Sequence, residues 1–130
     1  MTQRLNISSD SPWEDIVGYS RAVRVGNIIE VAGTTAVEGD MIIGKGNIYE
    51  QAMFVFQKIE KALQQAGASL NDVVRTRMYV TDITNWEDVG KAHAAFFKEI
   101  KPVATMVEVN KLIHEDLLIE IEVTAIRGDK

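Results

Sequence analysis

Carboxylate and guanidinium side chains recur at alternate positions in the stretches of this sequence that read as strands. Glu120 and Glu122 are separated by one residue in the run 118–125, and Arg75 and Arg77 by one residue in another such run. Because successive side chains of a strand point to opposite faces, each pair lies on one face of a sheet. A carboxylate in a partly buried cleft can gain a pKa near neutrality and act as a general acid or base. The alternative for Glu120 is an interface glutamate that Arg75 or Arg77 holds in an ion pair.

The other reactive side chains give no recognisable metal or cofactor site. The chain has no cysteine, and its histidines, His93 and His114, have no partner at metal-ligand spacing. We expect His93, on the apolar face of a helix, to be a satisfied core residue and His114, in a polar loop, to be a free surface imidazole. The glycine-rich run 39–46 lacks the Lys-Ser/Thr of a phosphate loop. The sequence therefore predicts neither a metal nor a cofactor.

The balance of charge argues against several classes of partner. The formal net charge is −5 and the positive side chains are scattered, which disfavours binding to nucleic acid. No apolar run approaches the ~20 residues that span a bilayer, and no signal peptide is recognisable at the N-terminus. We therefore expect a cytoplasmic protein without membrane contact. The length suits a single domain over 1–130, built around one core.

Apolar periodicity predicts the elements that must position these side chains. Gly26-Asn27 reads as a tight hairpin turn, Gly67 as a helix stop, and Thr84 with Glu87 as a capping box. An irregular arm precedes the first strand, with one helical turn that begins at Ser11. The expected strands are 19–25, 27–32, a short 41–43, 73–81, 102–110 and 118–125, and the expected helices are 47–66 and 84–98.

Helices that follow strands in this order can cover only one face of a mixed sheet. We expect apolar side chains, including Ile29, Val31, Val74, Met78, Val80, Val103, Val107, Ile119 and Ile121, to lie beneath the helices, with Thr105 pointing the same way. Helix 84–98 is expected to bury Trp86, Val89, His93, Phe96 and Phe97. The opposite face is expected to carry Glu30, Arg75, Arg77, Tyr79, Ala104, Met106, Glu108, Glu120 and Glu122. This mixture of charged, small and apolar groups is unlike a plain solvent face.

Several motifs taken in order resemble the Rid (YjgF/YER057c/UK114) family over about 19–126. They are Gly18-Tyr19, Gly26-Asn27-Ile-Ile, Ala32-Gly33-Thr34, Ala66-Gly67, the run 73–82, Ala95-Phe-Phe, Pro102-Val-Ala-Thr, Val107-Glu-Val and Ile119-Glu-Ile-Glu-Val. The resemblance implies an α+β, chorismate-mutase-like mixed β-sheet with two helices packed on one face. It also implies a homotrimer with a central barrel and small-molecule clefts between its subunits. The unusual face of the sheet would then be subunit interface.

The family's best-known activity is the hydrolysis of enamines and imines, such as 2-aminoacrylate, to 2-keto acids and ammonia. In members with this activity, an arginine two residues after the proline clamps the substrate carboxylate, and here that position is Ala104. The family's cysteine matches Met106, and its glutamate that positions the attacking water matches Glu120, which is present. A bidentate guanidinium–carboxylate pair is hard to replace with another side chain. The positions that the resemblance places at the ligand are Tyr19, Ala32, Gly33, Thr34, Gly90, Ala104, Thr105 and Met106.

Three functions remain open at this point. The first is a Rid-like enzyme of altered specificity, acting through Glu120 on a cyclic or uncharged imine or enamine. The second is a ligand-binding or regulatory trimer without chemistry, and the third is an endoribonuclease or translation inhibitor, which the acidic charge and the lack of a histidine pair disfavour. Arg24 or Arg77 could supply a relocated anion clamp. Alternatively, Arg77 could form a compensating ion pair with Glu30 across the barrel.

Overall fold

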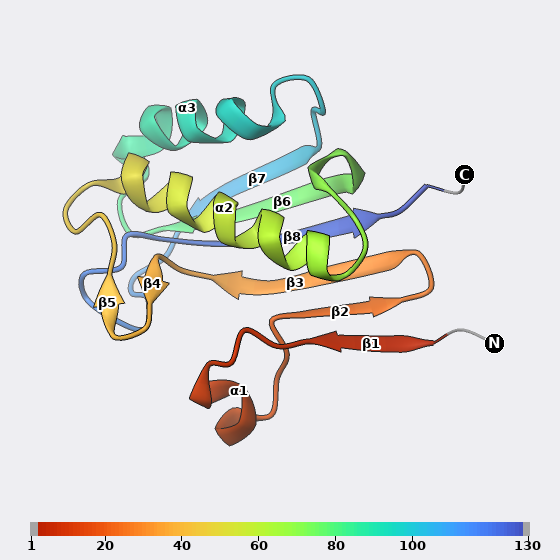
Figure 1. Ribbon diagram of the computed structural model, residues 1–130. Coiled ribbons are helices and arrows are strands. Elements are labelled where there is room, and N and C mark those ends of the chain that lie inside the picture. The colour runs from red at the N-terminus through yellow and green to blue at the C-terminus, as the bar shows by residue number, and fades with distance from the viewer. Residues whose placement is uncertain (1–2, 129–130) are drawn as a thin grey trace.

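The computed structural model describes residues 3–128 and shows a six-stranded mixed sheet with two helices on one face (Figure 1). The strand order is β1-β2-β3-β8-β6-β7; β6 and β7 are parallel and the other neighbours antiparallel. The α+β class and the mixed sheet with helices on one face are confirmed. The strands are β1 (Arg4–Ile7), β2 (Ala22–Val25), β3 (Ile28–Thr34), β4 (Val37–Glu38), β5 (Met41–Ile42), β6 (Val73–Val80), β7 (Val103–Glu108) and β8 (Ile119–Ile126), and the α-helices are α1 (Pro12–Val17), α2 (Ile48–Gln65) and α3 (Trp86–Phe97).

Helix α2 follows from its apolar stripe and from the groups that end it. Val55, Ile59 and Leu63 recur at helical spacing and are fully buried against the sheet. The helix stops before Gly67, whose φ of 83° suits glycine, as predicted. Arg24 Nη1 donates to the carbonyl of Ala66 at 2.7 Å, so this guanidinium serves the end of α2. Arg24 Nε also donates to the carbonyl of Gly26 at 2.8 Å, so the fork of Nε and Nη2 that would hold a carboxylate is already in use.

Helix α3 begins two residues later than predicted, because a different side chain makes the turn before it. Asp82 Oδ1 accepts hydrogen bonds from the backbone N and Oγ1 of Thr84, and a 3₁₀ turn precedes the helix, so the capping box at Thr84 is wrong. Trp86 is 57% exposed, which contradicts its predicted place in the core. His93 is the satisfied core residue expected, because its Nε2 lies 2.9 Å from Thr76 Oγ1.

Strand β7 presents the opposite face to the one predicted. Its parallel register places Ala104 beside Thr76 and Met106 beside Met78, and both β6 partners are buried beneath the helices. Ala104 and Met106 therefore point toward α3, and Thr105 points to the helix-free face with the β7 valines. Strict alternation shows which residues share a face but not which face is covered, and that ambiguity produced the error.

An edge position explains why apolar side chains of β7 can lie uncovered in one chain. Val103 and Val107 are 56% and 42% exposed on the helix-free face. We call this surface the open face and define it by Glu30, Arg77, Tyr79, Thr105, Val107 and Glu122.

A β-bulge between Val73 and Arg75 buries Val73 and leaves Val74 exposed, so the predicted burial of Val74 is wrong as well.

The N-terminal arm is more ordered than the sequence indicated. Strand β1 pairs with β2 at the sheet edge, and helix α1 follows with the Ser11 side chain as its N-cap. The buried carboxylate of Glu14 accepts hydrogen bonds from Ser8 and Ser9, which fixes α1 beside the sheet. Over residues 3–128, no helix is both long and apolar enough to cross a membrane.

Candidate functional site

The Glu120 side chain lies directly on the backbone of Gly33. Strand β8 presents Glu120 beside Tyr79 of β6, while its neighbours Ile119 and Ile121 are buried beneath the helices. On the other side, β3 is irregular between Val31 and Thr34. A β-carbon at Gly33 would lie 2.1 Å from Glu120 Oε2, so the carboxylate occupies space that only glycine leaves.

The Glu120 carboxyl is half-buried and has no polar partner of its own. Within residues 3–128 it makes neither a hydrogen bond nor an ion pair. Burial raises its pKa above the ordinary glutamate value, and the charge of Glu122 adds to the rise while Arg21 opposes it. A carboxylate with a raised pKa is a stronger base than an ordinary glutamate, so it accepts a proton from a bound water molecule more readily.

Arg21 is the charged group that the sequence analysis missed at this site. Its Nη1 donates to the carbonyl of Gly33 at 2.9 Å and to Thr34 Oγ1 at 3.0 Å. Thr34 Oγ1 donates in turn to the carbonyl of Ala32 at 2.7 Å, and the Tyr19 ring centroid lies 5.7 Å from the guanidinium carbon. The structure thus brings together five of the predicted positions, Tyr19, Ala32, Gly33, Thr34 and Glu120, around an arginine.

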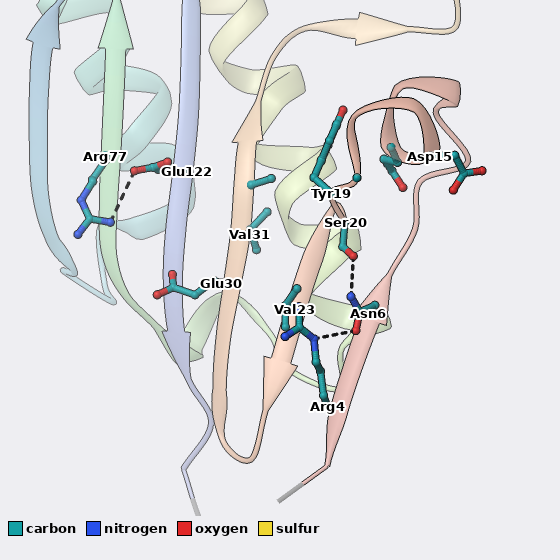
Figure 2. A pocket seen from close by; sticks show the side chains of 13 residues that line it. Arg4, Asn6, Asp15, Tyr19, Ser20, Val23, Glu30, Val31, Arg77 and Glu122 are labelled. Carbon is teal, nitrogen blue, oxygen red and sulfur yellow. Dashed lines mark hydrogen bonds and ion pairs between the residues drawn. The ribbon is translucent and has the colours of Figure 1, made fainter.

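The other arginine considered as an anion clamp is already paired. Arg77 Nη1 lies 3.6 Å from Glu122 Oε1 (Figure 2). The Tyr79 hydroxyl donates to the same oxygen at 2.9 Å. The hydrogen bond to Glu122 raises the pKa of Tyr79. Glu30 accepts instead from Thr124 Oγ1 at 2.6 Å, so the expected Glu30–Arg77 pair does not form within one chain.

An open cavity of about 760 Å³ lies on this side of the molecule, between the arm and the open face. Tyr19 and Asp15 stand near one end, and Arg77 and Glu122 stand across from them (Figure 2). Exposed polar side chains line the cavity at β1 and β2, where Arg4 Nε donates to Asn6 Oδ1 and Asn6 Nδ2 donates to Ser20 Oγ. The cavity is wide, polar and unroofed in a single chain.

A second, smaller cavity of about 460 Å³ lies between α3 and β7, and we call it the edge groove. It is apolar at its floor and basic at its rim, which carries Lys98 and Lys101. Its lining residues are Met78, Gly90, His93, Ala94, Phe97, Lys98, Lys101, Pro102, Ala104 and Met106.

The predicted ligand positions therefore form two groups rather than one site. Gly90, Ala104 and Met106 line the edge groove, whereas the Glu120 group lies at β3 and β8, across β6 from β7 (Figure 1). Thr105 belongs to neither group and lies exposed on the open face. Residues 3–128 contain no cluster of His, Cys, Asp or Glu able to hold a metal ion.

Comparison with known proteins gives consistent matches over nearly the whole chain. The family model described as "Endoribonuclease L-PSP" matches residues 10–127. The Streptomyces coelicolor protein SCO2049 is 38% identical over 122 residues, covering 94% of this chain and 91% of its own. The RutC family protein PYRAB12510 of Pyrococcus abyssi is 40% identical over 110 residues, covering 82% and 84%.

A solved structure extends the match to three dimensions. The crystal structure of Rv2704 from Mycobacterium tuberculosis, described as a member of the YjgF/YER057c/UK114 family, superposes with a TM-score of 0.88 at 50% identity. The match covers 95% of this chain and 99% of that one. Yeast Mmf1, at 24% identity and a TM-score of 0.83, shares the fold.

Proposed function

The chain belongs to the Rid (YjgF/YER057c/UK114) family, and we propose that it works as a homotrimer whose inter-subunit clefts take an imine- or enamine-type metabolite other than 2-aminoacrylate. In this trimer, the open faces of three chains pack around a central barrel. Each cleft lies where the Glu120 group of one subunit meets the edge groove of the next.

The distribution of apolar and reactive groups supports the trimer. Val103, Val107 and Ile28 are 56%, 42% and 52% exposed, which is costly for three branched apolar side chains on one side of a sheet. Neither half of the predicted ligand site is enclosed in one chain. Contact between copies would bury these side chains and would bring Glu120 to the groove of a neighbour.

The Glu120 carboxyl is the observation that carries the proposed chemistry. Ionised, it would orient a water molecule and accept a proton as that water adds to the imine carbon. That proton would then pass to the nitrogen and give a carbinolamine. Transfer of the remaining hydroxyl proton to the same nitrogen, again through Glu120, would break the carbon–nitrogen bond, form the carbonyl and release ammonia. The raised pKa of this half-buried carboxyl and its lack of a partner suit both steps.

Ala104 and Met106 shape which substrate the cleft accepts. Ala104 supplies no guanidinium, and losing one charged hydrogen-bonding group weakens carboxylate binding by about 1.5–3 kcal/mol. The space it leaves joins the apolar floor formed by Met106 and Phe97. This arrangement favours a substrate with an apolar substituent over the small, polar 2-aminoacrylate.

A ligand-binding trimer without catalysis is the second candidate, because the alanine at position 104 removes a group that active relatives use. Ribonuclease activity, which the name of the matching family model suggests, has less support. His93 is hydrogen-bonded to Thr76 beside the edge groove, and His114 Nδ1 accepts from the backbone N of Asp116 in a surface loop. The two imidazoles are therefore engaged separately and offer no acid–base pair.

The test is to generate imines with an amino-acid oxidase and to follow their disappearance. Wild-type protein should hydrolyse imines with bulky apolar side chains faster than 2-aminoacrylate, and Glu120→Gln should abolish the activity. Glu108→Gln is the matched control, because Glu108 accepts a hydrogen bond from the backbone N of Ile83 far from Gly33. Full activity in Glu120→Gln would contradict the mechanism. Complete inactivity of the wild type, with a small molecule retained through purification, would favour the binding protein.

A further inference from the structure

We infer that Arg21 is the anion-binding residue of the cleft, so that the ligand is an imine or enamine whose carboxylate is held beside Gly33 rather than against β7. This inference rests on the proposed function, since it names the chemistry of the molecule that the cleft takes. It concerns a residue outside the motifs that carry the family resemblance.

The geometry leaves Arg21 free to bind a planar anion. Only Nη1 is engaged, by the carbonyl of Gly33 and by Thr34 Oγ1, and no other hydrogen bond of this guanidinium forms within residues 3–128. A guanidinium carries five donors in a fixed fork, so Nε and Nη2 remain for the two oxygens of a carboxylate. The bonds at Nη1 fix the orientation of the fork in advance, which lowers the entropic cost of binding.

Arg21 forms no close ion pair, although its charge lowers the pKa of both Glu120 and Glu14. Among the residues that the structure describes, no carboxylate lies within 4.0 Å of it, whereas Arg77 is paired with Glu122 at 3.6 Å. Lys58 adds a second positive charge on the far side of the segment that follows β3, where its Nζ donates to the carbonyls of Thr35 and Val37. Burial and, secondarily, the charge of Arg21 lower the pKa of Lys58 to about 8. The positive charges of Arg21 and Lys58 favour the binding of an anion here, although the net charge of the chain is negative.

The position of Arg21 relative to Glu120 determines how a bound anion would be oriented toward the catalytic carboxyl. Both side chains contact the backbone of Gly33. Arg21 donates a hydrogen bond to its carbonyl, and Glu120 lies against its α-carbon. An anion on Arg21 would therefore place the carbon next to its carboxylate near Glu120, where water must attack. The apolar substituent would then extend toward the edge groove of a neighbouring subunit. The class that fits is a 2-imino acid with a branched or aromatic side chain.

A binding experiment with a charged probe and its neutral isostere tests the inference without requiring turnover. The probes are 4-methyl-2-oxopentanoate and 4-methyl-2-oxopentanamide, titrated into the intact protein by calorimetry. The acid should bind wild type at least about 10-fold tighter than the amide. Arg21→Gln should weaken the acid about 10- to 100-fold and leave the amide unchanged, and Arg21→Lys should restore part of the loss.

Two further variants separate this role from its alternatives. Arg77→Gln removes the competing arginine and should keep the affinity for the acid, measured on protein that light scattering shows to have the wild-type mass. Thr34→Val removes the hydroxyl that orients Arg21 and keeps the volume of the side chain. It should weaken binding of the acid but not of the amide, and it therefore serves as the test if Arg21→Gln fails to fold. Equal loss of acid and amide in Arg21→Gln, unchanged acid affinity in that variant, or failure of the wild type to bind the acid would overturn the inference. Selective loss of the acid in a protein that hydrolyses no imine would refute the proposed reaction alone.

Discussion

Glu120 and Gly33 are in such close contact that the glutamate occupies the volume of the β-carbon that glycine lacks. The 2.1 Å between Glu120 Oε2 and a β-carbon built at Gly33 is far shorter than any real contact. The conformation of β3 at its irregular end and the position of the half-buried Glu120 carboxyl are thus a single feature.

Gly33→Ala should displace the Glu120 side chain. We expect a loss of imine hydrolysis close to that of Glu120→Gln, with only a small cost in unfolding free energy, because the new β-carbon meets the end of a flexible side chain that can move away. Gly90→Ala is the matched control for stability, because no atom lies within 4 Å of a β-carbon built there. Urea denaturation and the imine assay measure the two effects. Unimpaired activity in Gly33→Ala would show that the observed position of Glu120 is not required.

Glu120→Gln should stabilise the protein near neutral pH. The folded-state pKa of Glu120 is raised, chiefly by burial, so folding disfavours its ionised form. The stability it contributes is present below the unfolded value of 4.5 and is lost as the pH rises through the folded pKa. The advantage of the glutamine variant should therefore be largest at pH 7 and should shrink toward pH 4. Thermal unfolding across this range checks the sign, and Glu108→Gln should show no such trend.

The acid limb of the pH–rate profile should lie above pH 4.5 and should depend on Arg21. Arg21 lowers the pKa of Glu120, because its positive charge favours the carboxylate. Arg21→Gln should therefore move the acid limb of kcat to higher pH, whereas Arg77→Gln should leave it nearly in place. A limb that does not move when Arg21 is removed would separate the two residues functionally.

Val107→Asp should break the trimer, since it would place a charge in the proposed interface on the open face. Val107 is 42% exposed in one chain, and Tyr49, on the helix layer, is 39% exposed. Tyr49→Asp is therefore a control of similar exposure that should leave the assembly intact. Light scattering during size-exclusion chromatography measures the mass, and a monomeric wild type would refute the trimer outright.

Local patterns were sufficient for much of this fold. The stripe of Val55, Ile59 and Leu63, the turn at Gly26-Asn27 and the stop at Gly67 each specify an element through neighbouring residues alone. The face of β7 was mispredicted because both of its sides carry small or apolar groups. Only its register with Met78 of β6 decides which side the helices cover.

The sequence placed part of the candidate site, and the absence of Arg21 from that prediction has a physical explanation. Tyr19, Gly33 and Glu120 could be placed by resemblance, but Arg21 acts through the carbonyl of Gly33, twelve residues away in sequence. No spacing rule reports such a contact. The available signal was an arginine two positions after Tyr19, on the same side of the chain, in a protein without an arginine at position 104.

The central claim is that each cleft combines Glu120 of one subunit with the edge groove of another. It can be tested by co-expressing two inactive variants, Glu120→Gln and Ala104→Trp, the second of which blocks the groove. In random mixed trimers, about a quarter of the interfaces would pair an intact Glu120 with an open groove. We predict that imine hydrolysis recovers to about that fraction of the wild-type rate. Activity that stays at the level of the separate variants, although mixed trimers have formed, would contradict the claim.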